Sequence, residues 1–413
     1  MPDDILNYQQ ALAKMEAAGQ AHVLQYFNEI NDQEKTRLLT QISDCDVDLA
    51  REIMRGASRA HAGKITPIEV LTHEQIQPRY KDFENAGMDA IRQGKVAALL
   101  LAGGQGSRLG VSQSKGMVNI GKTKELFIFE CLFNNVLEVV GKAGCWIPFC
   151  VMTSESNNHA IKEFLVSKNF FGYNPQQVRF FVQDMLPAVD FEGKYLLSSK
   201  SSLALSPNGN GGWFPPMRRA GVVAELQRQG VEWINAFAID NVLQKIADPL
   251  FIGAVIRGGF SCGAKVVAKR YPEENIGVIC KRNGKPSIVE YFELTEEMIH
   301  GRDANGGPLY NYGVILNYLI NLERVEEIDQ KKMFMHSAKK KINTIDTRGQ
   351  PYTPEKENGY KPETLILDMV ELIGNCLPFE VLRDKEFAPI KYKEGKDSIV
   401  TARELLLQNG IEV

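Results

Sequence analysis

A short apolar run opens into a glycine-rich, basic loop in the first third of the chain. Residues 96–102 are all apolar, which suits a strand buried on both faces. Four glycines then fall within eight positions: Gly103, Gly104, Gly106 and Gly110. Arg108 lies inside this loop and Lys115 lies just beyond it. Because glycine lets main-chain N–H groups turn inward without a Cβ in the way, the loop predicts a backbone cradle for phosphate.

The spacing of these glycines excludes two familiar nucleotide-binding loops. A Walker A loop reads GxxxxGK[ST], and no Lys-Ser or Lys-Thr follows the glycines here. A dinucleotide-binding fingerprint reads GxGxxG, whereas this loop reads GxGxxxG from Gly104. A tight turn without a ligand is the alternative, and the presence of Arg108 and Lys115 favours an anion site.

Asp240 and Gln183 each end a predicted strand. Asp240 follows the apolar run INAFAI, where a carboxylate opposite a phosphate loop is well placed to hold Mg²⁺ together with substrate phosphates. The competing interpretation of Asp240 is an N-cap for a helix in VLQKIADPLF. Gln183 ends VRFFV, and its carboxamide is both donor and acceptor, so it is able to read a base edge or a pair of sugar hydroxyls. An ordinary strand-end hydrogen bond is the alternative for Gln183.

A second glycine loop, residues 208–212, reads Asn-Gly-Asn-Gly-Gly. Two such loops at one sheet edge leave room for a nucleotide plus a second group, and a wide turn is the alternative. The sequence shows no recognisable Ser–His or Cys–His nucleophile pattern. That fits phosphoryl or nucleotidyl transfer, because positioning and charge neutralisation do most of that chemistry. A phosphomonoester is largely dianionic near neutral pH, since its second pKa is about 6, and such a nucleophile needs no general base.

Predicted strands and helices alternate around these residues. Residues 1–56 are expected to be helical, with a capping box at Asn31 and Glu34, and residues 80–93 form a further helix. Downstream, predicted strands 146–153, 178–183 and 233–239 alternate with predicted helices 125–140, 157–166 and 218–229. Short β-rich runs from residue 262 predict an antiparallel extension. The pattern predicts a mostly parallel sheet covered on both faces, with ligands beyond the carboxyl ends of its strands.

The composition is that of a globular protein with a sizeable core. The chain has 413 residues, of which 44% are hydrophobic, and a net charge of −3. Without a general basic field, nucleic acid is not an expected partner. The seven cysteines show no CxxC spacing, so reduced thiols are expected, and the six histidines form no zinc pattern. With neither a secretory signal nor an apolar run of ~20 residues, we expect a cytoplasmic protein with no membrane partner.

The loop and the segments after it resemble one family. LAGGQGSRLG followed by Lys-Gly closely resembles the signature of eukaryotic-type UDP-N-acetylhexosamine pyrophosphorylases, which are UTP–N-acetylglucosamine-1-phosphate uridylyltransferases. Further segments resemble the family in order: FVQDMLPAV, PNGNGG, AIDNVLQKIADPLFIG, GAKVVAKR, IGVIC, IVEYFEL, EVLRDKEFAPIK and TAREL. The likeness covers roughly residues 90–405.

The resemblance implies an α/β fold of the nucleotide-diphospho-sugar transferase type, similar to the glycosyltransferase A fold, with a Rossmann-like mixed sheet. We expect a helical N-terminal region (1–94), a catalytic domain (95–342) and a small α+β C-terminal domain (343–413). The implied reaction is attack of N-acetylglucosamine 1-phosphate on the α-phosphorus of UTP, with release of pyrophosphate. Mg²⁺ or Mn²⁺ is the implied cofactor, and we expect a monomer or a weak dimer.

The resemblance also implies roles for individual residues. The uracil-binding set is Leu101, Ala102, Gly103, Gly104 and Gln183, with Gly209 nearby. The sugar-binding set is Asn210, Gly277, Glu290 and Asn311, with Tyr291 beside it. Arg108 and Lys115 would face the leaving pyrophosphate, and Asp240 would accompany the metal. Lys391 would reach the phosphates from the C-terminal domain, which is therefore expected to close over them.

Several positions depart from the family pattern. Ser114 stands where Pro usually precedes Lys-Gly, which is expected to loosen the loop because Pro fixes φ. Segment 311–314 reads Asn-Tyr-Gly-Val in place of the usual NAGN, and Leu365 and Leu367 replace an aromatic pair expected near the N-acyl pocket. These changes leave open another acceptor, glucose 1-phosphate or N-acetylgalactosamine 1-phosphate. A nucleotide-sugar-binding protein without turnover is the remaining alternative.

Overall fold

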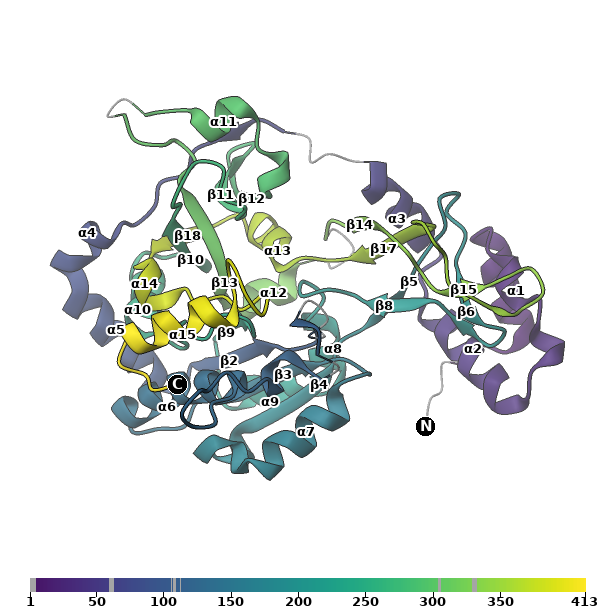
Figure 1. The fold of residues 1–413 in the computed structure, drawn as a ribbon, viewed down its shortest axis with the longest axis horizontal. Coiled ribbons are helices and arrows are strands. Elements are labelled where there is room, and N and C mark those ends of the chain that lie inside the picture. Colours follow the sequence, from purple (N-terminus) through teal and green to yellow (C-terminus); the bar gives the residue numbers. More distant parts are fainter. Residues whose placement is uncertain are drawn as a thin grey trace. The chain divides into compact units, whose positions relative to one another are not determined.

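The computed structural model describes residues 5–58, 63–104, 106, 109–111, 113–303, 306–328 and 333–413. The chain divides into two compact units, each built from separate stretches of sequence (Figure 1). The first, here called the helical unit, comprises Met1–Ala62, Asp184–Gly212 and Met333–Leu365. The second, the sheet unit, comprises Gly63–Gln183, Trp213–Lys332 and Ile366–Val413.

A mixed sheet of ten strands organises the described part of the sheet unit. Its main path runs through β1 (Ile65–Thr66), β11 (Val278–Arg282), β13 (Tyr312–Asn321), β9 (Trp233–Ala238), β2 (Val96–Leu101), β3 (Phe149–Thr153) and β4 (Val178–Val182). Beside this path, β10 (Cys262–Ala268) pairs with β13 and with β18 (Cys376–Glu380), and β12 (Lys285–Val289) pairs with β11. Strands β9, β2, β3 and β4 are parallel, whereas β13 is antiparallel to β9. The predicted parallel sheet with an antiparallel extension is confirmed.

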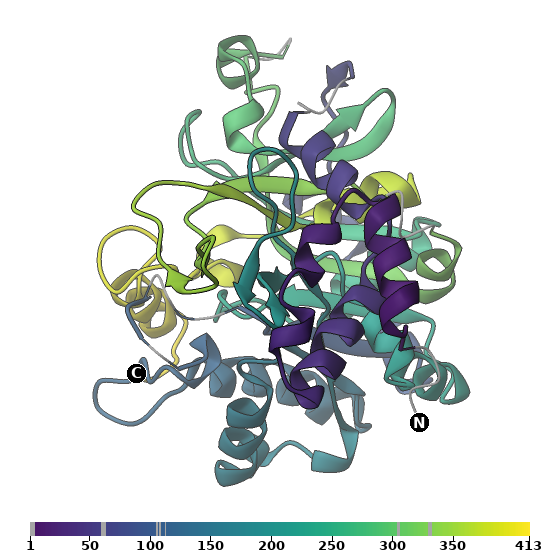
Figure 2. The same cartoon turned by 90° about the vertical axis from the view of Figure 1, so that its right-hand side faces the viewer.

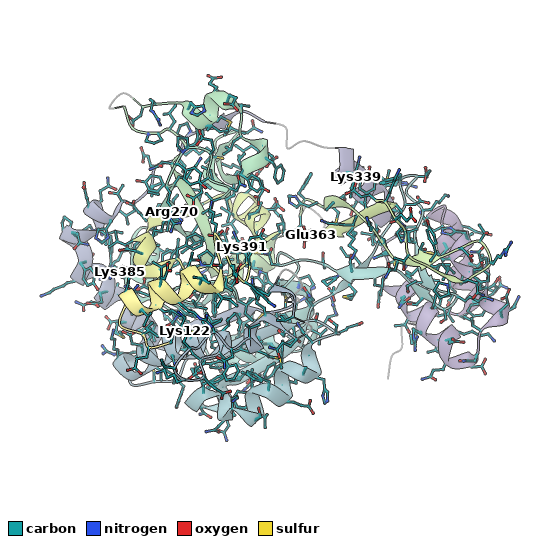
Figure 3. The ribbon with its side chains drawn as sticks, viewed as in Figure 1. Lys122, Arg270, Lys339, Glu363, Lys385 and Lys391 are labelled. Atoms are coloured by element: carbon teal, nitrogen blue, oxygen red, sulfur yellow. The ribbon has the colours of Figure 1, made fainter. Side chains whose placement is uncertain are left out.

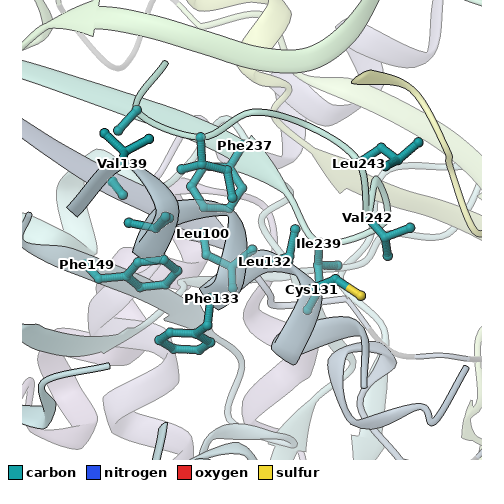
Figure 4. Close-up of a cluster of buried hydrophobic side chains, with 14 of the residues drawn as sticks. Leu100, Cys131, Leu132, Phe133, Val139, Phe149, Phe237, Ile239, Val242 and Leu243 are labelled. Atoms are coloured by element: carbon teal, nitrogen blue, oxygen red, sulfur yellow. The ribbon is translucent and has the colours of Figure 1, made fainter. Parts of the chain in front are cut away.

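Strand β2 lies between β9 and β3, in the interior of the sheet. All six of its residues are buried, as are all six of β9, which is why both strands read as unbroken apolar runs. Figure 4 shows the surrounding core, in which the rings of Phe133 and Phe149 stack with their centroids 4.7 Å apart. This packing fixes the direction in which the loop after Leu101 leaves the sheet.

The helices of the sheet unit connect and cover its strands. They are α4 (His73–Ile76), α5 (Tyr80–Arg92), α6 (Ile128–Ala143), α7 (Asn158–Ser167), α8 (Phe214–Arg219), α9 (Val222–Arg228), α10 (Pro249–Arg257), α11 (Glu296–His300), α12 (Leu322–Glu327), α13 (Ile366–Ile373), α14 (Arg383–Glu386) and α15 (Ile399–Gln408). The prediction of a single helix over residues 218–229 is wrong, because Gly221 takes a left-handed φ of 76° between α8 and α9. Within the described ranges, no helix combines the length and apolar character that a membrane span requires.

The helical unit has its own core. Figures 1 and 2 show its helices α1 (Tyr8–Ala17), α2 (Asp32–Asp44) and α3 (Leu49–Ser58) grouped together in purple. They pack with four two-stranded pairs: β5 (Met185–Pro187) with β8 (Leu205–Pro207), β6 (Leu197–Ser199) with β7 (Ser202–Leu203), β14 (His336–Lys340) with β17 (Gly359–Glu363), and β15 (Thr344–Ile345) with β16 (Pro351–Tyr352). The predicted capping box at Asn31 and Glu34 is confirmed at the start of α2.

The two units differ from the three consecutive segments expected from the sequence. Residues 63–94 belong to the sheet unit, while 184–212 and 333–365 leave it for the helical unit. The segment after residue 365 returns, and β18 pairs in parallel with β10 along Cys262–Val266. The C-terminal residues are therefore part of the main sheet and its surroundings, because strand pairing places them there regardless of their distance in sequence.

Candidate active site

One edge of the sheet collects most of the predicted site residues. Strands β2 and β9 are parallel and end together at the paired residues Leu101 and Ala238. Strand β13 begins at the same edge, because it is antiparallel to β9. The first residue of β11, Val278, pairs with Gly313 near the start of β13, so β11 begins there as well. The glycine loop, Gln183 and Asp240 thus leave the sheet on one side, as expected for ligand sites in such sheets.

Gly103 and Gln183 are in direct contact. A Cβ added at Gly103 would overlap the carboxamide of Gln183, so glycine is what allows this side chain to lie where it does. Gln183 is 5% exposed, and its backbone N–H donates to the carbonyl of Thr153 at 2.8 Å. At Gly104, in contrast, an added Cβ would have no described atom within 4 Å. The loop therefore begins with one glycine packed against a polar side chain and continues with one open to a ligand.

Asn157 holds the start of this loop. Its Nδ2 donates to the carbonyl of Ala102 at 3.0 Å, and its Oδ1 accepts from the backbone N–H of Ser154 at 2.8 Å. The side chain thus links the ends of β2 and β3. The sequence analysis did not identify Asn157, although a Ser-x-x-Asn pattern just after a strand is a typical side chain–backbone turn.

The far end of the loop folds back on itself. Gly106 lies against Val111, since an added Cβ would be 2.6 Å from its Cγ2, and Gly110 has a left-handed φ of 64°. Ser114 has a φ of −58°, which is the value that Pro would impose. The expected loosening at Ser114 is therefore not seen in the backbone. Its hydroxyl is buried without a hydrogen-bond partner among the described residues.

Lys115 and Asp240 face each other across the edge. The distance between Lys115 Nζ and Asp240 Oδ2 is 3.8 Å, and the side chains are 16% and 30% exposed. The capping interpretation of Asp240 is wrong, because α10 begins at Pro249 and Asp248 is its N-cap, accepting from the N–H of Leu250 at 3.1 Å. A role of Asp240 toward metal and phosphate stays a prediction. Arg108, predicted to face the pyrophosphate, lies outside the described residues.

Lys391 is brought to the same place by the C-terminal segment. The backbone N–H of Ile390 donates to the carbonyl of Asp240 at 2.8 Å, which sets Lys391 beside that residue. Lys391 Nζ is 3.2 Å from Asp397 Oδ2, and its backbone N–H donates to the Asp397 carbonyl at 2.6 Å. Figure 3 labels Lys391 within the sheet unit.

A pocket of about 270 Å³ adjoins the ion pair of Lys391. Its lining includes Arg270, Arg383, Lys396 and Asp397. Burial lowers the pKa of Arg383, Glu274 at 2.7 Å raises it, and Arg270 lowers it further, so that the net direction is downward. The pocket therefore places one partly desolvated guanidinium, that of Arg383, together with the exposed cations Arg270 and Lys396 near Lys391.

Three of the residues expected to hold the sugar meet at the same edge. A Cβ added at Gly277 would lie 3.6 Å from Glu290 Oε2, and the Gly277 carbonyl accepts from Val314 N–H at 2.9 Å. The carbonyl of Asn311 accepts from Lys269 N–H at 2.8 Å. Gly277, Glu290 and Asn311 thus surround the ends of β11, β12 and β13. Tyr291 follows Glu290 and is 43% exposed.

The other predicted sugar and uracil contacts belong to the helical unit. Gly209 has a φ of 84° and packs so closely on the carbonyl of Thr364 that a Cβ would overlap it. Gly211 packs in the same way on Leu365, and its N–H donates to the Thr364 carbonyl at 2.9 Å. The second glycine loop, which carries Asn210, is thus a closely packed turn whose glycines make room for residues 364–365.

Asp240 fits a magnesium site that is completed by substrate. Among the described residues, no group of three His, Cys, Asp or Glu side chains gathers as a metal cage would require. Mg²⁺ is commonly bound by one or two carboxylates together with substrate phosphates and water. A half-buried carboxylate beside Lys115 meets that requirement once phosphates are bound.

A family model, individual protein sequences and solved structures were each found to match this chain, and their names agree on one kind of enzyme. Residues 47–408 match the family model described as UTP–glucose-1-phosphate uridylyltransferase. The chain is 35% identical to human UDP-N-acetylhexosamine pyrophosphorylase-like protein 1, covering 97% of this chain and 84% of the relative. It is 33% identical to the UDP-N-acetylglucosamine pyrophosphorylase of Saccharomyces cerevisiae, covering 95% and 88%. The crystal structure of the uridine diphosphate N-acetylglucosamine pyrophosphorylase from Trypanosoma brucei in complex with inhibitor superposes with a TM-score of 0.82 at 25% identity, covering 96% and 84%.

Proposed function

Because the chain belongs to the UTP–glucose-1-phosphate uridylyltransferase family, we propose that it transfers the uridylyl group of UTP to N-acetylglucosamine 1-phosphate and releases pyrophosphate. The relatives that match over nearly their full length carry that activity in their names. The structural observation that carries the proposal is the meeting of the Gly103–Gln183 contact with the Lys115–Asp240 pair at one sheet edge.

Gly103 and Gln183 are suited to hold uracil. The imide edge of uracil offers a donor flanked by acceptors, and a carboxamide supplies one acceptor and one donor side by side. The close packing of Gln183 on Gly103 limits where that amide points. At Gly104, no atom of the described residues lies within 4 Å of an added Cβ, so glycine there lets the nucleotide approach the backbone.

Lys115 and Lys391 are suited to the triphosphate. In the reaction, an oxygen of the sugar phosphate forms a bond to the α-phosphorus of UTP while the bond to the pyrophosphate oxygen breaks. The charge that develops on the leaving pyrophosphate is stabilised by fixed cations. Both lysines lie beside carboxylates, at 3.8 Å from Asp240 and 3.2 Å from Asp397, and UTP phosphates would replace these partners. Mg²⁺ or Mn²⁺ held at Asp240 would add positive charge to the phosphates.

Glu290 and Asn311 are suited to the sugar. The carboxylate of Glu290, 3.6 Å from where a Cβ of Gly277 would lie, is able to accept hydrogen bonds from two neighbouring hydroxyls. This hydroxyl recognition is shared by several hexoses, so the acyl group must be read elsewhere.

Glucose 1-phosphate is a second candidate acceptor. The matching family model is named for it, and Leu365 and Leu367 stand where aromatic residues are expected near an N-acyl group. The experiment offers UTP with N-acetylglucosamine 1-phosphate, N-acetylgalactosamine 1-phosphate or glucose 1-phosphate and measures pyrophosphate release. The highest kcat/KM is expected for N-acetylglucosamine 1-phosphate. A clear preference for glucose 1-phosphate would overturn the acyl-sugar assignment, and tight UDP-sugar binding without turnover would favour a binding protein.

A cytoplasmic location is proposed with this activity. Cys262 and Cys376 face each other in paired strands and are both thiols, as are the other five cysteines. Two buried thiols at directly opposite positions suit a reducing compartment.

A further inference from the structure

A buried ion cluster lies behind the candidate active site. Lys265 of β10 is 0% exposed, and its ammonium is 2.8 Å from Asp248 Oδ2 and 2.6 Å from Glu386 Oε2. The third acceptor is the carbonyl of Lys245, at 3.2 Å. An ammonium has three protons, so every donor of Lys265 is used.

The cluster is charged in spite of its burial. Burial alone would lower the pKa of Lys265, but the attraction of Asp248 and Glu386 outweighs it and raises that pKa. A buried ion trio of this kind often contributes little net stability compared with apolar side chains of the same volume. What it does supply is a fixed geometry, because each partner has one position in which all hydrogen bonds are made.

The two carboxylates of the cluster belong to the segments that carry Asp240 and Lys391, the groups proposed to bind metal and phosphate. Asp248 ends the loop that starts at Asp240. Glu386 starts the segment that ends at Lys391, and its carbonyl accepts from Asn241 Nδ2 at 2.7 Å. Between these points, the two segments are joined by the bond from Ala388 N–H to Asn241 Oδ1, at 2.9 Å.

The loop from residue 239 to 248 has little regular structure of its own. Buried amides hold its middle: Gln244 Nε2 donates to the carbonyl of Ala238 at 2.7 Å, and Asn317 Nδ2 donates to Gln244 Oε1 at 3.2 Å. Lys265 is the buried cation that ties the end of this loop to the C-terminal segment. Lys245 Nζ, on the exposed side of the loop, lies farther from Glu386, at 3.8 Å from Oε1. A change at Lys265 therefore reaches both segments at once.

We propose that Lys265 is a positioning residue for uridylyl transfer, which holds Asp240 and Lys391 in register through Asp248 and Glu386. The proposal rests on the proposed function for its chemistry. Lys265 itself is fully buried and touches no substrate. Its effect is on where the phosphate-binding groups stand.

The test compares three proteins with the unaltered chain. Lys265→Met removes the cation. A second variant, here called the charge-balanced variant because no member of the cluster is left charged, combines this change with Asp248→Asn and Glu386→Gln. The control is Arg179→Met, which removes a strand cation of the same sheet that is 31% exposed and lies 2.8 Å from the helix carboxylate Glu225. Thermal unfolding reports stability, and kcat and KM are measured for the reaction of UDP-sugar with pyrophosphate.

We expect Lys265→Met to lower kcat about 100-fold with little change in the KM for UDP-sugar, because small displacements of catalytic groups cost that much. The charge-balanced variant is expected to regain stability without regaining kcat. Arg179→Met is expected to lose stability and keep kcat. If kcat returns together with stability in the charge-balanced variant, Lys265 only neutralises buried carboxylates and the proposal is overturned. Failure of both Lys265 variants to fold overturns it as well.

The result remains separate from the proposed function. If the unaltered protein transfers no uridylyl group to any sugar phosphate, the proposed function fails. The positioning claim is then decided by a crystal structure of the charge-balanced variant. Loss of the Ile390–Asp240 backbone hydrogen bond supports it, and an unchanged bond overturns it.

Discussion

The backbone N–H of Ile390 donates a hydrogen bond to the carbonyl oxygen of Asp240 at 2.8 Å. This bond joins the proposed metal carboxylate to the residue before Lys391, although the two segments are far apart in sequence. The bond therefore sets Lys391 beside Asp240 through the backbone.

Asn241 is the side chain that supports this bond. It is 1% exposed and bridges the carbonyl of Glu386 and the N–H of Ala388. Asn241→Ala leaves both groups unpaired in the interior, so we expect a loss of about 2–4 kcal/mol in the free energy of unfolding, at about 1–2 kcal/mol per group. We also expect a lower kcat, because Asp240 and Lys391 lose their register. Denaturant unfolding and steady-state kinetics provide the two measurements.

Asn358 offers the control for this change. In the helical unit it bridges the N–H and the carbonyl of Ile342, at 2.8 and 3.0 Å. Asn358→Ala should lower stability in the same way and leave kcat unchanged. An equal loss of kcat in both variants would mean that the Asn241 effect is only a loss of folded protein.

Gly103→Ala tests the uracil site. The added Cβ overlaps the carboxamide of Gln183, whose flexible side chain must move away. We expect UTP affinity to fall at least about tenfold, which corresponds to one hydrogen-bonded contact of about 1.4 kcal/mol, with only a small change in thermal stability. Isothermal titration with UTP measures the affinity.

Gly104→Ala is the companion change, because a Cβ there meets no described atom within 4 Å. The stability of this variant should match that of the unaltered protein. Any loss of UTP affinity then comes from contact between the added methyl group and the bound UTP. Unchanged UTP affinity in Gly103→Ala would remove Gln183 from the uracil site.

Much of the site was predictable because it follows local pattern. The apolar run of β2, its glycine loop and Asp240 after β9 each carry a signal within a few residues. The helix cap at Asp248 also has a local sequence signal, because Pro249 follows it in the first helical position, where proline is favoured. That proline favours a cap at Asp248 over the alternative of a cap at Asp240.

Other features leave no local signal. Asn241 bonds to Glu386, 145 residues later in the chain, through a backbone carbonyl that every residue type possesses. Lys265 occupies a strand position that reads as an ordinary surface charge until its partners are seen. The division into units was likewise hidden, because residues 184–212 and 333–365 leave the sheet unit without a change in composition that marks their ends.

Mutations of Lys391 and of its partner Asp397 are expected to change different kinetic constants. Lys391→Met removes a cation from the leaving pyrophosphate, so kcat should fall about 100-fold or more. Asp397→Asn removes the carboxylate that lies 3.2 Å from Lys391 Nζ and that this ammonium must leave when it binds phosphate. Asparagine tolerates the left-handed φ of 52° found at this position. We expect a lower KM for pyrophosphate and an unchanged kcat in that variant. A fall of kcat in both variants would show that catalysis requires the intact ion pair between Lys391 and Asp397.

Asp240→Asn tests the metal site. A neutral carboxamide binds Mg²⁺ more weakly than a carboxylate, so we expect the Mg²⁺ concentration needed for half-maximal activity to rise and kcat to fall. Activity of the unaltered protein should disappear in EDTA and return with added Mg²⁺. Glu232→Gln, which removes an exposed carboxylate 3.0 Å from Lys95, is the control and should leave the Mg²⁺ dependence unchanged. Identical Mg²⁺ curves for all three proteins would exclude Asp240 as a ligand.

Asp248 should make the stability of the protein depend on pH. Burial alone would raise the pKa of Asp248, but Lys265 and Lys245 outweigh it and hold that pKa below the ordinary value of 3.8. The folded state therefore favours the ionised carboxylate, whose contribution is complete above the unfolded pKa and is lost as pH falls through the folded pKa. Asp248→Asn breaks a buried ion pair, so we expect a loss of about 3–5 kcal/mol in unfolding free energy at pH 7.

The difference between Asp248→Asn and the unaltered protein should shrink once the pH falls below about 4, where the unfolded carboxylate takes up its proton. Urea unfolding at a series of pH values measures it. Asp82→Asn is the control, since this carboxylate is 45% exposed in its contacts with Arg79 and Arg257, both at 3.4 Å. Its effect on stability should be small at every pH, because exposed ion pairs contribute only about 0–1 kcal/mol. A difference for Asp248→Asn that stays constant from neutral to acidic pH would show that the charge of Asp248 contributes nothing to stability, since asparagine caps a helix as well as aspartate does.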